Sequence, residues 1–149
     1  MRLAAALVWL VLAAGCSSAT AAVPTPTTEE APILASEGGV LRPIDNGSRL
    51  AMKSGYATVR LWPSPQSMDP SLQVALFDPS GQATSAEVWV VTEMLDMDHG
   101  TEKISATLRD GLYQMRLSFG MPGSWRLVVH VKRGGAEETI TLVLPWIGL

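Results

Sequence analysis

The stretch that decides the fold is residues 125–132, which read WRLVVHVK. Large apolar side chains share one phase of this stretch: Trp125, Leu127, Val129 and Val131. Successive side chains of a β-strand point to opposite faces of a sheet, so the alternation predicts a strand with one buried face. The stretch before it, residues 112–119 or LYQMRLSF, alternates in the same way. Its apolar phase holds Tyr113, Met115, Leu117 and Phe119.

Five further stretches predict strands, because they are short apolar runs or alternate in the same manner. They are Tyr56–Trp62, Leu72–Phe77, Glu87–Thr92, Lys103–Leu108 and Glu138–Leu144. Asp78-Pro79-Ser80-Gly81 suits a type I turn, and Gly134-Gly135 suits a hairpin turn. No stretch has the pattern of an amphipathic helix. About seven strands at short spacing predict an all-β fold, an immunoglobulin-like Greek-key β-sandwich.

Asp110-Gly111-Leu112-Tyr113 stands where one predicted strand begins. The motif is similar to a tyrosine corner, in which the tyrosine hydroxyl bonds to backbone nearby in the sequence. We therefore expect Tyr113 to be buried, with its hydroxyl on a backbone group a few residues away.

Length and composition bound the class of protein. The chain has 149 residues, enough for one domain, and a net charge of −3. Without an excess of Lys and Arg, a nucleic-acid partner is not expected. The single cysteine excludes a disulfide framework and paired-cysteine redox or zinc motifs. The chain has no Gly-rich phosphate loop, HExxH or GxSxG motif, and two histidines offer few general bases, so we expect no enzyme.

Residues 1–15 have the pattern of an export signal. Arg2 precedes the unbroken apolar run Leu3–Ala14, which is too short to span a bilayer. Ala13-Ala14-Gly15-Cys16 is similar to the lipobox of bacterial lipoproteins, where the chain is cut before a Cys that carries lipid. We expect a lipidated Cys16 and an extracytoplasmic lipoprotein anchored to a membrane of the bacterial cell envelope. The alternative is a plain signal peptide cut near Ala19-Thr20-Ala21-Ala22.

The segment after Cys16 differs in composition from the rest. Residues 17–38 are rich in Ser, Thr, Ala, Pro and Glu and contain few large apolar residues. Such a segment has little to bury, and its prolines cannot donate to a strand ladder, so we expect a flexible linker over residues 16–38. The folded domain is then expected over residues 39–149.

Methionine and histidine are the chemically unusual residues. Met94, Met97 and His99 lie in the segment 93–100, which follows a predicted strand and ends at a glycine. Met121 lies in a second turn, residues 119–125, and end loops of one sandwich can converge. Thioether and imidazole ligands together favour Cu(I) over hard cations. The four residues therefore predict a copper site at one end of the sandwich.

Two aspartates flank the histidine. Asp96 and Asp98 would either complete a Cu(II) or Zn(II) shell with His99 or orient its imidazole. Met97 and His99 stand in a polar stretch with no apolar phase, so packing explains them less well than it explains the other candidates.

Packing is the alternative role for several of these side chains, because methionine commonly fills gaps in cores. Met94 continues the apolar phase of the strand before it, and Met121 would pack under its turn. Met115 falls on the apolar face of its strand, so we expect it in the core. His130 falls on a polar face between Arg126 and Lys132, so we expect a solvated surface residue.

Several pieces of sequence together carry a family resemblance. They are Gly81…Ala86-Glu87-Val88, Met94-x-x-Met97-x-His99-Gly100, Asp110-Gly111-x-Tyr113 and Phe119-x-Met121-x-Gly123-x-Trp125-Arg126-Leu127. In order and spacing they resemble the YtkA-like domain, related to the FixH family, over roughly Gly55 to Val131. The resemblance implies a small exported β-sandwich, often lipid- or membrane-anchored, whose FixH relatives are linked to copper delivery and assembly of haem-copper oxidases. It implies Met97, His99 and Met121 as ligands, with Met94 as a further candidate.

The sequence is compatible with two functions. One is a copper-binding or copper-handling lipoprotein module. The other is a non-catalytic β-sandwich that binds a protein partner or supports an envelope assembly without a metal. Exposure of Trp62 or Trp89 would favour the second function, because Trp is enriched at interaction surfaces.

Overall fold

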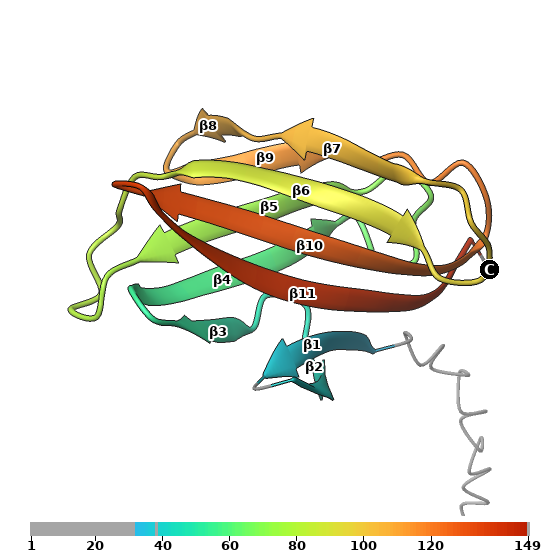
Figure 1. The fold of residues 1–149 in the computed structure, drawn as a ribbon, viewed down its shortest axis with the longest axis horizontal. Coiled ribbons are helices and arrows are strands. Elements are labelled where there is room, and N and C mark those ends of the chain that lie inside the picture. Colours follow the sequence, from blue (N-terminus) through green and yellow to red (C-terminus); the bar gives the residue numbers. More distant parts are fainter. Residues whose placement is uncertain (1–31, 38, 149) are drawn as a thin grey trace, which may run out of the picture.

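The computed structural model describes residues 32–37 and 39–148, so Cys16 and the predicted signal peptide lie outside the described residues. The described chain forms two antiparallel sheets of six and five strands, as predicted for a β-sandwich. Figure 1 looks onto the six-stranded sheet, with the five-stranded sheet behind it. No helix in the described ranges is long and apolar enough to cross a membrane.

The two sheets have the following strand orders. The six-stranded sheet runs β2 (Val40–Ile44), β1 (Ile33–Glu37), β11 (Ala136–Ile147), β10 (Gly123–Arg133), β6 (Glu87–Met94), β7 (Thr101–Ser105). The five-stranded sheet runs β3 (Arg49–Met52), β4 (Gly55–Trp62), β5 (Ser71–Phe77), β9 (Leu112–Arg116), β8 (Thr107–Arg109).

The connections interlock the two sheets. β5 leads to β6 and β9 leads to β10 across the sandwich, while β5 pairs with β9 and β6 pairs with β10. This is the Greek-key pairing of immunoglobulin-like sandwiches. The predicted single strand at residues 103–108 is two strands, β7 and β8, one in each sheet. The chain changes sheet at Ala106, whose N–H donates to the Val88 carbonyl at 2.9 Å.

The core lies between the sheets and follows the predicted alternation. In β10 the residues Trp125, Leu127, Val129 and Val131 are all buried. Met115 is buried as predicted, and so are Leu117 and Phe119 beyond the end of β9. The N–H groups of Leu117 and Phe119 donate to the carbonyls of Pro70 and Met68, so this extended segment is held by a loop rather than by a strand. A Pro-containing loop cannot supply a full ladder, which explains why the strand ends early.

The predicted linker over residues 16–38 is wrong at its C-terminal part. Ile33–Glu37 forms β1, which pairs with β2 and with β11. Ile33 and Ala35 face the core and are 2% and 1% exposed. The folded domain therefore begins before residue 39. The strand was missed because it has only five residues, of which only the β-branched Ile33 and the small Ala35 face the core. So short an alternation is hard to recognise beside a Pro- and Thr-rich stretch.

The tyrosine-corner prediction is half right. Tyr113 is buried, and its hydroxyl accepts a hydrogen bond from backbone, the N–H of Ala86 at 2.7 Å. Ala86 is 27 residues away and leads into β6, in the opposite sheet. Tyr113 therefore joins the two sheets, instead of closing a local corner. The Asp78–Gly81 turn forms as predicted, with the Gly81 N–H donating to the Asp78 carbonyl at 3.0 Å.

Candidate metal site at one end of the sandwich

The two Met-containing loops meet at the same end of the sandwich. The loop of residues 95–100 follows β6, and the turn of residues 117–122 precedes β10. Because Met94 of β6 pairs directly with Trp125 of β10, the end of one strand adjoins the start of the other. The predicted convergence of these loops is therefore confirmed.

Backbone and carboxylate hydrogen bonds fix the first loop to β10. The Leu95 N–H donates to the Ser124 carbonyl at 2.8 Å, and the Asp96 carboxylate accepts from the Ser124 N–H at 2.6 Å. Gly123 leaves room for this contact, since a Cβ there would lie 2.7 Å from Asp96 Oδ2. Asp98 accepts from the Gly100 N–H at 3.2 Å. Both aspartates thus shape the loop that carries His99.

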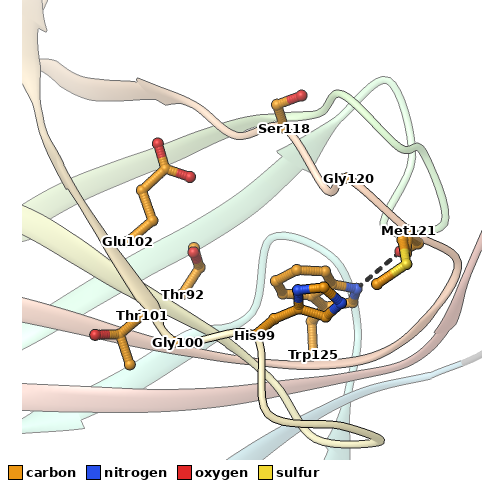
Figure 2. A pocket seen from close by; sticks show the side chains of 9 residues that line it. All are labelled: Thr92, His99, Gly100, Thr101, Glu102, Ser118, Gly120, Met121 and Trp125. Atoms are coloured by element: carbon orange, nitrogen blue, oxygen red, sulfur yellow. Dashed lines mark hydrogen bonds between the residues drawn. The ribbon is translucent and has the colours of Figure 1, made fainter.

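His99 and Met121 line one cavity of about 390 Å³. In Figure 2 the His99 ring, the Met121 thioether and the Trp125 indole gather on one side of it, with Glu102 on the other side. The remaining lining residues are Thr92, Gly100, Thr101, Ser118 and Gly120. The cavity therefore brings an imidazole and a thioether from two separate loops to one place.

Trp125 holds the second loop in position. Its indole N–H donates to the Met121 carbonyl at 3.2 Å, drawn as a dashed line in Figure 2. Its ring packs on Phe119 at 4.9 Å between centroids, and the side chain is largely buried. The turn carrying Met121 is thus tied to the strand that begins beneath it.

Met97 does not line the first cavity. It lines an adjoining cavity of about 330 Å³ together with His99, Asp98 and Met94. Met97 is 52% exposed, so its thioether is open to solvent. His99, like Gly100 and Thr101, lines both cavities, and it is the one predicted ligand that they share.

Met94 belongs to the core. It is 5% exposed, and a Cβ on Gly123 would lie 2.7 Å from its methyl group. Its sulfur is thus enclosed by packing. Core packing was the alternative role predicted for Met94 from its position in the apolar phase of β6. No single cavity holds all four predicted ligands, because Met121 shares one cavity with His99 while Met94 and Met97 share the other with it.

His130 is more enclosed than predicted. Its ring stacks on Trp89 at 4.9 Å and 8°, and its Nδ1 lies 2.6 Å from a carboxylate oxygen of Glu137. Lys103 covers Trp89 at 4.5 Å from the ring centroid. Trp89 lies directly opposite His130 on β6, and Glu137 lies on the neighbouring strand β11. The sequence pattern of β10 alone does not reveal these neighbours on other strands.

Sequence reasoning missed the polar lining of the first cavity. Thr92 is buried within β6, where its position in the apolar phase suggested only packing. Glu102 and Ser118 reach the cavity from β7 and from the segment after β9. No local motif marks either residue, since their meeting depends on the pairing of distant strands.

The donor set can be tested against possible metals. Within residues 32–37 and 39–148, no group of three or more His, Cys, Asp or Glu side chains is placed to hold a metal ion. The soft donors on the first cavity are the His99 imidazole and the Met121 thioether, a pair that suits Cu(I) and not hard cations. The arrangement is therefore compatible with a soft, low-coordinate site.

The fold and the loops define an all-β sandwich with a cavity of soft donors between end loops. The YtkA-like family model matches residues 53–130, which include both loops, and the chain belongs to this family. The chain matches no curated protein and no solved structure in the other comparisons.

Proposed function

We propose that this YtkA-like protein is a lipid-anchored, extracytoplasmic module that binds or carries copper. The observation that carries the proposal is the shared cavity of His99 and Met121, supplied by two loops that are separately fixed to β10. Loops held in this way keep their donors in place before a ligand arrives, which lowers the cost of binding.

Each residue has a stated role. His99 supplies the imidazole nitrogen, and Met121 supplies a thioether on the same cavity. Met97 supplies a further thioether from the solvent side, where it shares the second cavity with His99. The indole of Trp125 walls the first cavity, and an aromatic face attracts a cation. When bound, copper would supply soft-ligand coordination chemistry that zinc does not favour here.

The anchor is proposed from Cys16 and the apolar run before it. The sequence between Arg2 and Cys16 supports export, cleavage and lipid attachment. We expect that Cys16→Ala abolishes lipid attachment, as read from the intact mass and from detergent partition of the protein purified from whole cells. A wild-type mature chain that begins near Val23 without lipid would contradict the anchor.

The copper site is tested by titration with Cu(I) and Zn(II) in parallel. The mature chain from residue 16 with Cys16→Ser is used, because a free thiol would itself bind Cu(I). We expect His99→Ala to weaken Cu(I) binding by about tenfold or more, a change of about 1.4 kcal/mol. His130→Ala is the matched control and should bind as the parent does, because His130 lies on the outer face against Trp89.

The role of Met97 is tested in a double variant. Met97→Ala/His99→Ala should lose more Cu(I) affinity than His99→Ala alone. Affinity in the parent should also fall with acidity, because imidazole must be neutral to bind a metal. Equal Cu(I) affinity in the parent and the double variant would rule out this site.

A second candidate function is a metal-free module for protein interaction or envelope assembly. Trp62 is 51% exposed, and an exposed Trp is typical of interaction surfaces. If neither metal binds to the parent chain, this function takes the place of copper binding.

A further inference from the structure

Exposed apolar side chains gather at the end of the sandwich that holds the loops. Of the seven large apolar side chains exposed in the described part of the chain, four belong to this end. They are Trp62 at 51%, Leu95 at 44%, Met97 at 52% and Trp146 at 60%. Trp62 and Trp146 line neither cavity of the candidate metal site, while Leu95 lines the second cavity beside Met97; we call Trp62, Leu95 and Trp146 the end patch.

Hydrogen bonds between segments show that the end patch belongs to one end. Trp62 ends β4, and the loop that follows accepts a bond at the Gln66 carbonyl from the Gly148 N–H, at 3.1 Å. Ile147, next to Trp146, pairs with Gly123 at the start of β10. The Leu95 N–H donates to the carbonyl of Ser124, the residue after Gly123. The end patch therefore combines residues at or next to the ends of strands from both sheets.

The backbone at Trp146 holds its side chain outward. Its φ is 57°, a left-handed conformation that bulky residues rarely adopt. Strained backbone of this kind persists where the surroundings fix it, and it concentrates at functional sites. In the same segment, Ile147 is buried and Trp146 is exposed. The fold therefore presents a large aromatic side chain to the outside at an energetic cost.

The chain toward Cys16 leaves from this same end. β1 begins at Ile33 and runs antiparallel to β11, with Leu34 opposite Val143. The start of β1 thus lies beside the end of β11, where Trp146 stands, and Figure 1 shows β1 beginning on the side of the C-terminus. Residues 17–31 separate Cys16 from the described chain, a reach of about 50 Å at most.

A protein surface can be attracted to a membrane by basic side chains or by interfacial Trp side chains, and the charges around the end patch bear on which applies here. The segments 63–70, 95–100, 117–122 and 145–148 contain no Lys or Arg but include Asp69, Asp96 and Asp98. These four segments themselves offer anionic headgroups no attraction, although the exposed Arg116 directly precedes residues 117–122. Trp, in contrast, favours the boundary between headgroups and acyl chains, because it has an apolar body and a polar N–H.

We propose that the end patch rests on the interfacial region of the membrane to which Cys16 is anchored, with Trp146 and Trp62 inserted at headgroup level. The proposal rests on the anchor part of the proposed function and is independent of copper. The lipid chain limits the distance from the membrane, and the two indoles set the orientation of the sandwich against it.

The test measures quenching of Trp fluorescence by brominated phosphatidylcholine. The mature chain from residue 16 is coupled through its single thiol, Cys16, to a maleimide lipid in vesicles, so that the natural lipid is not needed. We expect quenching in the parent and loss of most of it in Trp62→Phe/Trp146→Phe. Trp89→Phe is the matched control and should keep the quenching, because Trp89 stacks on His130 on the outer sheet face.

Each outcome has a separate meaning. Equal quenching in the parent and the double variant would overturn membrane contact by the end patch, and a protein partner would then be the occupant. Stronger quenching after anionic lipid is added would also overturn it, because attraction through a basic face would be responsible. An unlipidated Cys16 in protein purified from cells would overturn the anchor itself and, with it, this proposal.

Discussion

Tyr113 is the residue whose polar atom matters most for the sandwich. Its hydroxyl accepts the Ala86 N–H at 2.7 Å, and the ring is buried between the sheets. Tyr113→Phe removes the acceptor and leaves a partly buried N–H without its partner, so we expect a loss of about 1–3 kcal/mol in the free energy of unfolding. Urea unfolding monitored by circular dichroism measures this loss.

The only other tyrosine provides the control. Tyr56 stacks on Phe77 and lies under Arg49, contacts that its ring makes without the hydroxyl. Tyr56→Phe should therefore change the free energy of unfolding much less than Tyr113→Phe does. Equal effects of the two substitutions would show that the Tyr113 hydroxyl does not join the sheets.

At the scale of elements, β1 decides where the folded domain begins. Ile33 is buried in the core and Leu34, the next residue, is only half-buried on the outer face. Truncation of a buried Ile leaves a cavity, so Ile33→Ala should destabilise the protein by about 2–5 kcal/mol. Leu34→Ala should cost clearly less. A flexible linker at this position would give no loss for either variant, and urea unfolding distinguishes these cases.

The joint between the first loop and β10 depends on Gly123. Its φ is 149°, and a Cβ would lie 2.7 Å from both Asp96 Oδ2 and the Met94 methyl group. Gly123→Ala should lower the free energy of unfolding by about 1–3 kcal/mol and displace the loop that carries His99. We therefore expect weaker Cu(I) binding in the same variant.

A glycine at the other end of the sandwich provides a control that distinguishes backbone strain from displacement of the His99 loop. Gly39 has a φ of 85° but open space around it, and it lies in the turn between β1 and β2. Gly39→Ala should cost stability through strain alone and leave Cu(I) affinity unchanged. If both variants bind Cu(I) like the parent, the position of the loop does not control the site.

The seven predicted stretches became strands, one of them divided into β7 and β8, because long apolar phases such as that of β10 force one face into the core. β1, β2 and β3 were missed, since each has only four or five residues and is stabilised by pairing with a neighbouring strand rather than by its own pattern: β1 with β11 and β2, and β3 with β4. The register between β6 and β10 also determines which residues meet at the candidate metal site. The pairing of Met94 with Trp125 brings His99 and Met121 together, and no local spacing contains that pairing.

At the scale of the whole molecule, one end of the sandwich carries three features. The candidate metal site and the end patch lie there, and Figure 1 shows that β1 begins on the same side. The opposite end holds short turns such as Gly134-Gly135. We therefore expect the proposed copper binding and the proposed membrane contact at the same end, from which the chain leads toward Cys16.

The ligands of bound copper test the central claim most directly. X-ray absorption at the copper edge is recorded on the Cu(I)-loaded mature chain with Cys16→Ser, and on Met121→Ala and Met52→Ala made in it. Met52 ends β3 at the opposite end and serves as the matched methionine control. We expect nitrogen and sulfur scattering in the parent, a reduced sulfur contribution in Met121→Ala and no change in Met52→Ala. A spectrum without sulfur, or one that Met121→Ala leaves unchanged, would contradict a copper site formed by His99 and Met121.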